Sequence, residues 1–320
     1  MVIASMGRKL GLFAAACALG LGLAAGTAVQ QALAAEVSLF PYEGGTPEIV
    51  ASAEGALTLS EGINYDVDGD DQLEAISLTG FVDGVSVNGA LLIDGYEAVR
   101  GLPDELQESS LKLELIKLPN SCLLLHVCGY CNESVGDGLD RLYKVEVGSD
   151  PSDSEFAHNV KLVIDCYNNP YLVEGKGITN RGCELDLIVG NYISLSVSCT
   201  TRVAGTVSYC IDYKCSKTGK ATHCFYNPSM ACSHFYKNGE RCYYSPTLRD
   251  VKVYTGVKCK KYTTIKKGTQ MYVSGIYDKG ATKLLLVKTK PKGSNKSVVA
   301  GYIKINAKPL FKYAQVNVAG

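Results

Sequence analysis

The sequence predicts a mainly β protein, built as propeller-blade-like or sandwich-like antiparallel sheets followed by a small barrel. Short apolar runs alternate with polar residues at a period of two, as strands with one buried face do. Turn residues interrupt these runs at intervals of about ten residues, a rhythm typical of sandwiches, barrels and propeller blades. The chain has 20 Tyr, 7 Phe and no Trp, and Tyr suits a half-buried sheet face.

Residues 1–35 have the pattern of a secretory signal peptide. Arg8 and Lys9 precede an apolar run rich in Ala, Leu and Gly, and Ala32 and Ala34 give the small-residue spacing of a cleavage site. A retained membrane anchor is the alternative, but it would need about 20 strongly apolar residues. This run is shorter, contains several Gly and ends in polar residues. We therefore expect cleavage, export and no transmembrane segment in the mature chain.

Charge divides the rest of the chain into three expected domains. Residues 36–150 contain 22 acidic and 5 basic residues, a net charge of −17, whereas residues 248–320 contain 16 basic and 2 acidic residues, a net charge of +14. Such segregation, hidden by an overall charge of zero, indicates modules with different surfaces. We expect an acidic β domain at 36–155, a cysteine-rich β region at 156–247 and a basic domain at 248–320.

The acidic domain is expected to hold several strands and one short helix. Residues 73–82 and 85–93 flank an Asp-Gly dipeptide and so predict a hairpin. Residues 111–118 alternate, and residues 122–128 are apolar almost throughout, as in a strand buried on both faces. Residues 103–107 are the helix candidate, because their acidic residues suit a first turn.

Alternating acidic residues precede the first strand of this hairpin. Three Asp at alternate positions and a Glu four residues later would direct several carboxylates to one point, and Ca²⁺ takes about six to eight oxygens. Asp71 stands where such loops usually have Gly, and Asp tolerates a positive φ better than most residues. An acidic turn without metal is the alternative. The expected ligands are Asp66, Asp68, Asp70, Gln72 through its backbone carbonyl, and Glu74.

This loop resembles the Asp-x-Asp-Gly-Asp-Gly loop that precedes a strand in the FG-GAP and VCBS-type repeats of secreted bacterial proteins. The resemblance covers residues 66–74 and, more loosely, the strand pattern to about Val147. It implies that the metal is a structural Ca²⁺. Ser77 stands where a helix–loop–helix calcium site would have its bidentate Glu, and no helix follows, so the loop is not an EF-hand.

Cleavage of the signal would leave twelve cysteines, an even number. In an exported chain such a number favours disulfides, although sequence does not give their connectivity. Two pairs bracket short turns closely enough to be bridged. Cys232 and Cys242 flank an Asn-Gly turn, the strongest hairpin signal in the chain, and Cys215 and Cys224 flank a Lys-Thr-Gly-Lys turn.

Zinc and a cysteine nucleophile are the chemical alternatives to disulfides. Cys128 and Cys131 have zinc-ligand spacing and two His and two Cys lie within residues 223–234, but no second Cys-x-x-Cys pair matches the first. A catalytic cysteine needs a base and usually a helix N-terminus. Cys166 is followed by an Asn-Asn-Pro turn, and His126, in its apolar strand, is expected to be a hydrogen-bonded core residue. We therefore expect no catalytic residues.

The basic domain carries two short motifs. Residues 265–268 read Ile-Lys-Lys-Gly before a strand, and residues 301–303 read Gly-Tyr-Ile. They resemble bacterial SH3-like domains, which have a turn of Leu or Ile, a basic pair and Gly, and a late Gly-Trp-Ile/Val with Trp where this chain has Tyr. The resemblance covers about residues 249–308 and implies a small barrel. In secreted bacterial proteins such domains commonly dock onto the cell wall, which implies an anionic wall or envelope polymer as partner.

These observations predict a secreted extracytoplasmic binding protein that docks on the bacterial cell wall or envelope through its basic domain. A divergent wall hydrolase and a secreted factor acting on host or competitor proteins are the alternatives. The basic residues could also be a solubilising coat or a dock for the acidic domain. Nucleic acid is not an expected partner, because the basic residues lie in an exported domain. The candidate ligand-binding residues are Tyr254, Tyr262, Lys266, Lys267, Tyr272 and Tyr302.

Overall fold

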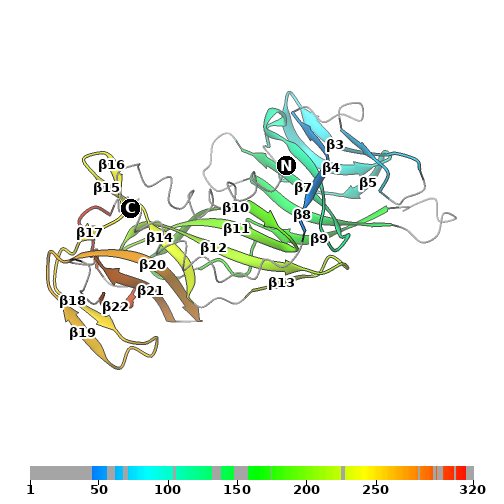
Figure 1. Ribbon diagram of the computed structural model, residues 1–320. Helices are drawn as coiled ribbons and strands as arrows, with labels where there is room; N and C mark the ends of the chain where they lie inside the picture. Colours follow the sequence, from blue (N-terminus) through cyan, green and yellow to red (C-terminus); the bar gives the residue numbers. More distant parts are fainter. Residues whose placement is uncertain are drawn as a thin grey trace.

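Antiparallel β-sheets form almost all of the regular structure (Figure 1), which confirms the mainly β prediction. A 3-10 helix, η1 (Glu108–Ser110), is the one helical element in the part that is described. Among those same residues, no helix is long and apolar enough to span a membrane. The expected signal peptide lies outside the described residues. The computed structural model describes residues 45–55, 62–67, 71–103, 106–131, 138–147, 158–173, 175–224, 228–279, 282–290, 293, 298–305 and 308–314.

A four-stranded sheet contains the predicted hairpin. Its turn residues Asp83 and Gly84 have φ values of 51° and 77°, which is the backbone of a two-residue hairpin turn that Asp-Gly favours. Ile76 and Leu91 of this sheet are fully buried in the core shared with the next sheet. The strands are, in order, β2 (Ile63–Tyr65), β3 (Glu74–Val82), β4 (Val85–Ile93) and β5 (Tyr96–Val99).

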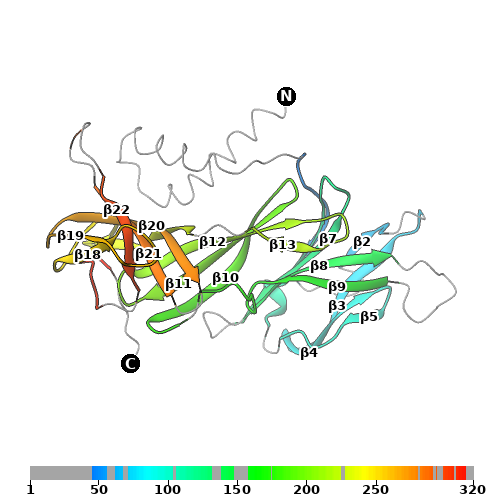
Figure 2. The same cartoon turned by 90° about the horizontal axis from the view of Figure 1, so that it is seen from below.

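A five-stranded sheet lies between the four-stranded sheet and the eleven-stranded sheet and contributes side chains to two cores (Figures 1 and 2). Leu125 and Val127 point into a core shared with the four-stranded sheet, whereas Leu124 and Leu142 point into a second core shared with the largest sheet. This confirms that residues 122–128 contain a strand buried on both faces. In order across the sheet, the strands are β1 (Glu48–Glu54), β6 (Lys112–Lys117), β7 (Leu123–Tyr130), β8 (Gly138–Val147) and β9 (His158–Asp165).

The largest sheet has eleven strands and joins the two regions expected on either side of residue 247. The join is the pairing of Ser229 with Ile276 and of Met230 with Gly275. A Cβ on Gly275 would lie 3.0 Å from the Ser229 carbonyl oxygen, so glycine allows this close approach. The path runs through β10 (Ile178–Val189), β11 (Tyr192–Thr201), β12 (Gly205–Cys215), β14 (Ser229–Ser233), β20 (Gln270–Lys279), β21 (Thr282–Thr289), β22 (Ala300–Lys304), β18 (Val251–Tyr254) and β19 (Tyr262–Ile265), with β13 (Ala221–His223) on β12 and β17 (Ser245–Pro246) on β20.

Sheet pairing crosses the domain boundaries that charge predicts at residues 155 and 247. β9 lies beyond the expected boundary at residue 155 and pairs with β8, so it belongs to the five-stranded sheet. The five strands β18 to β22 lie within the expected basic domain. They continue the sheet of β10 to β14 and share its core, because Val253 and Val287 lie in the same buried cluster as Leu195 and Val207.

A short two-stranded ribbon, β15 (Phe235–Lys237) and β16 (Glu240–Cys242), forms at the Asn-Gly dipeptide. Asn238 and Gly239 have φ values of 54° and 84°, so the turn has the conformation that this dipeptide predicts. Phe235 is fully buried and its ring centroid lies 5.0 Å from that of Phe311. The ribbon is therefore held against the body of the molecule by an aromatic pair.

The prediction of a helix at residues 103–107 is wrong at residues 106–107, which the structure describes as extended. Leu106 and Gln107 instead form single β-bridges with Cys131 and Val85, while residues 104–105 lie outside the described part of the chain. Leu106 is fully buried in the core between the two smaller sheets. Tertiary burial of this side chain therefore overrides the local preference for a helical turn.

Replacing adjacent residues of β7 tests whether both faces of the central sheet are buried. Leu124→Ala and Leu125→Ala should each lower the free energy of unfolding by about 2–5 kcal/mol, because each removes methyl groups from a different core. The control is Leu162→Ala on β9, whose side chain is 49% exposed and should change stability by less than about 1 kcal/mol. Urea denaturation measures all three. A large effect at Leu125 with none at Leu124 would contradict packing against the eleven-stranded sheet.

Candidate functional site

The loop before β3 has the local geometry expected of the acidic motif. Asp71 has a φ of 66°, which is the left-handed conformation predicted at its position. The Val67 amide donates to Glu74 Oε2 at 2.6 Å, and the Asp71 amide donates to Asp66 Oδ2 at 3.1 Å. Both carboxylates therefore turn inward onto the loop backbone.

The expected calcium ligands are only partly described. Asp68 and Asp70 lie outside the described residues, and among the residues that are described no group of three metal-ligating side chains occurs. The register pairs Tyr65 with Glu74, so Glu74 closes the loop where β3 begins. It is 5% exposed. A carboxylate has about four acceptor positions, so accepting an amide proton does not prevent it from also binding a cation.

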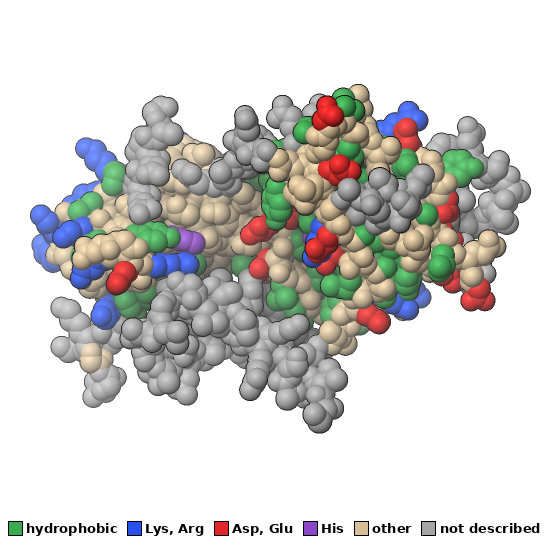
Figure 3. Space-filling view, turned by 90° about the horizontal axis from the view of Figure 1, so that it is seen from above, with side chains coloured by type: hydrophobic (Ala, Val, Ile, Leu, Met, Phe, Trp, Pro, Cys, Tyr) green, Lys and Arg blue, Asp and Glu red, His purple; other side chains and the backbone are tan. Residues whose placement is uncertain are grey.

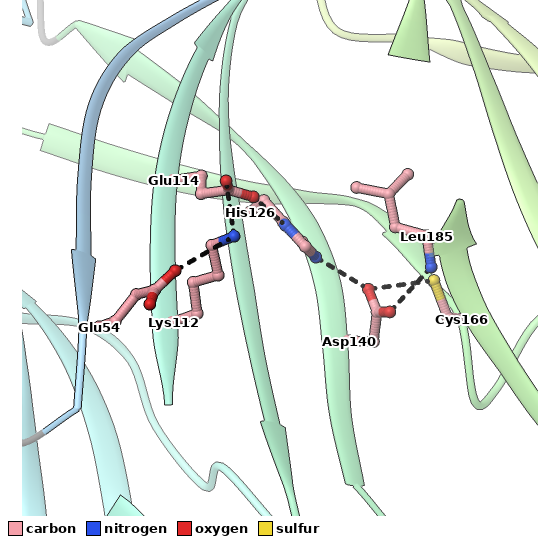
Figure 4. Close-up of polar contacts among 7 residues, drawn as sticks. All are labelled: Glu54, Lys112, Glu114, His126, Asp140, Cys166 and Leu185. Carbon is pink, nitrogen blue, oxygen red and sulfur yellow. Dashed lines mark hydrogen bonds and ion pairs between the residues drawn. The ribbon is translucent and has the colours of Figure 1, made fainter. Parts of the chain in front are cut away.

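A row of ionic side chains crosses the face of the five-stranded sheet that is directed towards the eleven-stranded sheet (Figure 4). Strand register aligns it, since Glu54 lies opposite Lys112 and Glu114 lies opposite His126. The contacts, in order, are Lys112 Nζ to Glu54 Oε1 at 3.4 Å, Lys112 Nζ to Glu114 Oε1 at 2.9 Å, His126 Nδ1 to Glu114 Oε2 at 3.1 Å and His126 Nε2 to Asp140 Oδ1 at 3.1 Å.

His126 lies between two carboxylates, an arrangement that favours its cationic form. Burial lowers its pKa, but the hydrogen bonds to Asp140 and Glu114 outweigh burial, so the pKa is raised. The hydrogen bond from His126 lowers the pKa of Glu114 to about 2. Both ring nitrogens are engaged as donors, which leaves no lone pair to bind a metal or to accept a proton. His126 is therefore a hydrogen-bonded core residue, as expected from its strand.

Asp140 extends this row into the eleven-stranded sheet. Its Oδ2 accepts the Leu185 amide of β10 at 2.8 Å, and its Oδ1 accepts the Cys166 thiol at 3.4 Å (Figure 4). The hydrogen bond to Cys183 and burial both raise the pKa of Cys166. Cys166 is fully buried. Its thiol contacts the carboxylate of Asp140 and not the imidazole of His126. It thus lacks both the thiolate character and the imidazole base that a nucleophilic cysteine needs.

A second histidine pairs with a serine on β12. Ser208 Oγ lies 2.7 Å from His234 Nε2, and a guanidinium nitrogen of Arg241 lies 3.4 Å from the same atom. Burial and the Arg241 charge lower the pKa of His234 to about 4. The imidazole is therefore neutral at pH 7 and is a weak base, which suits a hydrogen-bonded contact better than proton abstraction.

The residues of the zinc alternative make different contacts. His223 stacks on Tyr171 with ring centroids 3.9 Å apart. Cys128 lies in β7, where burial raises the pKa of its thiol to about 12, and a zinc-bound cysteine is a thiolate. Cys131 lies beside Leu106 in a β-bridge.

The two cysteine pairs expected from sequence are not brought together. Neither pair forms a disulfide in the described structure. Cys215 lies opposite Ala221 and Cys224 continues the same register to a position opposite Asp212, so the two side chains leave opposite faces of the hairpin. Cys232 belongs to β14 of the eleven-stranded sheet, whereas Cys242 belongs to the β15–β16 ribbon.

Four of the six residues expected to bind ligand lie on one face of the C-terminal strands. Tyr254 is opposite both Tyr262 and Tyr302, and Tyr272 is opposite Lys288 on the same face. Ring centroids are 5.9 Å apart for Tyr254 and Tyr262. At the other side of the face, the ring centroid of Tyr272 lies 4.7 Å from that of Tyr243 and 5.3 Å from that of Tyr244.

Lysines lie over these rings. Lys252 Nζ is 4.3 Å from the ring centroid of Tyr262, Lys304 Nζ is 5.8 Å from that of Tyr254, and Lys290 Nζ is 5.3 Å from that of Tyr244. All three lysines are exposed. The name Tyr–Lys face is used below for the surface formed by these residues: Tyr243, Tyr244, Lys252, Tyr254, Tyr262, Tyr272, Lys290, Tyr302 and Lys304.

The two lysines predicted at the Ile-Lys-Lys-Gly turn contact Asp250, just before β18. Lys266 Nζ contacts Asp250 Oδ2 at 3.0 Å, and the Lys267 amide donates to Asp250 Oδ1 at 2.8 Å. The turn follows β19, and Gly268 has a φ of 81°, as expected. Lys252, Lys290 and Lys304 take the place of these lysines beside the rings. Sequence reasoning missed them because their positions depend on strand register.

Charge is separated along the described surface. Figure 3 shows Lys and Arg side chains gathered over the end of the molecule formed by β18 to β22, and acidic side chains over the end formed by the two smaller sheets. Comparison with family models, with curated proteins and with solved structures finds no match. The two resemblances drawn from short motifs therefore stay hypotheses.

The stabilising effect of His126 should depend on pH. Its pKa is raised above 6.5, so its contribution is full below pH 6.5 and is lost as pH rises through the raised value. The pKa of Glu114 is lowered from 4.5 to about 2, so its contribution is full above pH 4.5 and is lost as pH falls towards 2. The difference in unfolding free energy between wild type and His126→Gln should be largest between these limits.

Urea denaturation at a series of pH values measures this difference, with His234→Gln as the control. The pKa of His234 is lowered from 6.5 to about 4, so its contribution should be full above pH 6.5 and should fall on acidification. A His126→Gln difference that grows as pH rises above 6.5 would contradict a cationic His126.

Proposed function

We propose that this protein is a secreted extracytoplasmic binding protein that docks on an anionic polymer of the bacterial cell wall or envelope. The observation that carries the proposal is the Tyr–Lys face. Lys252 and Lys304 lie over tyrosine rings, where cation–π attraction favours the positions of their ammonium groups. Neighbouring strands are about 4.8 Å apart, so the face repeats positive charge and aromatic surface at short intervals, which suits a polymer with repeated anionic groups.

The charge of the surrounding region supports the same proposal. Residues 248–320 contain 16 basic and 2 acidic residues, so the region attracts anions over roughly the Debye length, about 8–10 Å at physiological salt. The described acidic surface gathers at the opposite end of the molecule (Figure 3), so the Tyr–Lys face is not covered by it. The hydrolase alternative loses support at Cys166, whose thiol contacts Asp140.

Polymer binding should depend on the Tyr–Lys face. The chain without residues 1–35 should co-sediment with purified cell walls at low salt and detach as salt rises. Lys252→Glu with Lys304→Glu should weaken binding about tenfold, because each reversal replaces an attraction of about 0.5–1 kcal/mol by a repulsion. Tyr254→Ala with Tyr262→Ala should weaken it while leaving the net charge unchanged.

The matched control changes the same charge at a distance from the face. Lys161→Glu with Lys217→Glu alters exposed lysines of β9 and of the turn after β12. It changes the net charge by the same amount as Lys252→Glu with Lys304→Glu, but should weaken sedimentation much less. Equal losses in both charge variants would mean that overall charge, and not this face, makes the contact. No sedimentation of the wild type at low salt would remove the proposed role.

We also propose that the loop before β3 holds a structural Ca²⁺ ion. The positive φ of Asp71 and the inward carboxylates of Asp66 and Glu74 are the observations that favour it. The residues present fit the ion, because carboxylate and carbonyl oxygens are its preferred ligands. The bound ion would draw its ligand residues together and would stabilise the start of β3.

Calcium should therefore raise the melting temperature of the wild type, because an ion that binds only the folded state stabilises it. Affinity should be weak, with a Kd on the order of 10⁻⁴–10⁻³ M, as in other extracellular modules. Asp66→Asn should abolish the calcium response while melting close to wild type in chelator. Differential scanning calorimetry with calcium and with chelator decides this, and identical wild-type melting in the two conditions would favour the acidic turn.

A further inference from the structure

We propose that two disulfides, Cys122–Cys215 and Cys166–Cys183, fasten the five-stranded sheet to the eleven-stranded sheet. In each pair one cysteine lies at the end of a strand of the first sheet, and the other lies in a strand of the second. All four side chains are buried in the same core, with exposed fractions of 4% or less. Neither pair was among those expected from sequence, because the partners are far apart in the chain.

A single asparagine holds the backbones of Cys122 and Cys215 together. Asn120 Oδ1 accepts the Cys122 amide at 3.0 Å, and Asn120 Nδ2 donates to the Cys215 carbonyl at 2.9 Å. Asn191 completes the arrangement, because its Oδ1 accepts the Asn120 amide at 3.1 Å and its carbonyl accepts the Cys215 amide at 2.7 Å. Cys122 and Cys215 also lie close enough for each thiol to shift the pKa of the other. A disulfide requires such close backbones.

Asp140 has the same role for Cys166 and Cys183. Its carbonyl accepts the Cys166 amide at 3.0 Å, and its Oδ1 accepts the Cys166 thiol at 3.4 Å. Its Oδ2 accepts the amide of Leu185, two residues after Cys183, at 2.8 Å. Figure 4 shows the Cys166 sulfur and the Leu185 amide meeting at this carboxylate. Cys183 also lies close enough to Cys166 to raise the pKa of its thiol.

Oxidation of each pair is a thiol–disulfide exchange with an external low-molecular-weight disulfide. One thiolate attacks a sulfur of that disulfide, and a mixed disulfide forms as the first external thiolate leaves. The second thiolate of the pair then attacks the mixed disulfide and displaces the other external thiolate. Overall, two protein thiols lose two electrons and two protons, and the external disulfide becomes two thiols.

Both pairs are buried in the folded protein, so the exchange takes place before the two sheets close on each other.

Counting thiols in the full chain tests the connectivity. The purified protein is refolded with oxidised glutathione, denatured, labelled with a maleimide and weighed intact. Compared with wild type, Cys215→Ala should gain one labelled thiol, that of Cys122, whereas Cys122→Ala with Cys215→Ala should gain none. Cys166→Ala and its double variant with Cys183→Ala should behave in the same way.

Peptide mapping identifies the residue that is labelled in Cys215→Ala. If Cys215 were bonded to Cys224 in the wild type, this variant would label Cys224 in place of Cys122, and the proposal would be overturned. Peptide mapping of the non-reduced wild type is independent of variant folding and should find peptides linked between Cys122 and Cys215 and between Cys166 and Cys183. Labelled Cys122 or Cys166 in the wild type overturns the corresponding bond. This inference rests on the proposed export only because export gives the cysteines access to an oxidant. Neither thiol labelling nor peptide mapping depends on polymer binding.

Discussion

The buried carboxylate of Asp140 is the contact on which the join between the two halves of the molecule depends. It accepts hydrogen bonds from His126 of β7, from the Cys166 thiol after β9 and from the Leu185 amide of β10. A buried carboxylate is stable only when such donors satisfy it. Each donor comes from a different element, so satisfying this one charge fixes β7, β8, the end of β9 and β10 relative to one another.

The central sheet transmits that constraint to the rest of the fold. Leu125 packs towards the four-stranded sheet and Leu124 towards the eleven-stranded sheet, so β7 contributes to both cores. Polar residues on the second of these faces contact one another in the ionic row, which runs from exposed Glu54 to buried Asp140. At the buried end of the row, the Leu185 amide and the Cys166 thiol also satisfy Asp140.

The same organisation determines where a binding surface can form. The inner face of β18 to β22 is occupied by core residues such as Val253 and Ile303, so the opposite face is the one that carries Tyr254, Tyr262 and Lys304. Because β20 continues the sheet through β14, this surface is supported by the whole eleven-stranded sheet. The Tyr–Lys face is consequently a rigid platform at the end of the molecule away from the acidic sheets.

The sequence by itself determined the features that depend on near neighbours in the chain. Alternation at a period of two predicted the strands, and Asp83-Gly84 and Asn238-Gly239 predicted their turns, because the allowed backbone angles of those residues are local properties. The segregation of charge and the positive φ of Asp71 were predicted for the same reason. The tyrosines at 254, 262, 272 and 302 were identified, although their common face was not.

Only the tertiary structure decided which strands meet and in which register. His126 lies between Glu114 and Asp140, and β14 pairs with β20, through contacts between distant parts of the chain. The helix expected at residues 103–107 gave way to the burial of Leu106, and Cys215 meets Cys122 in place of Cys224. Strand order and register are set by the packing of both faces of each sheet at once, and no short stretch of sequence contains that information.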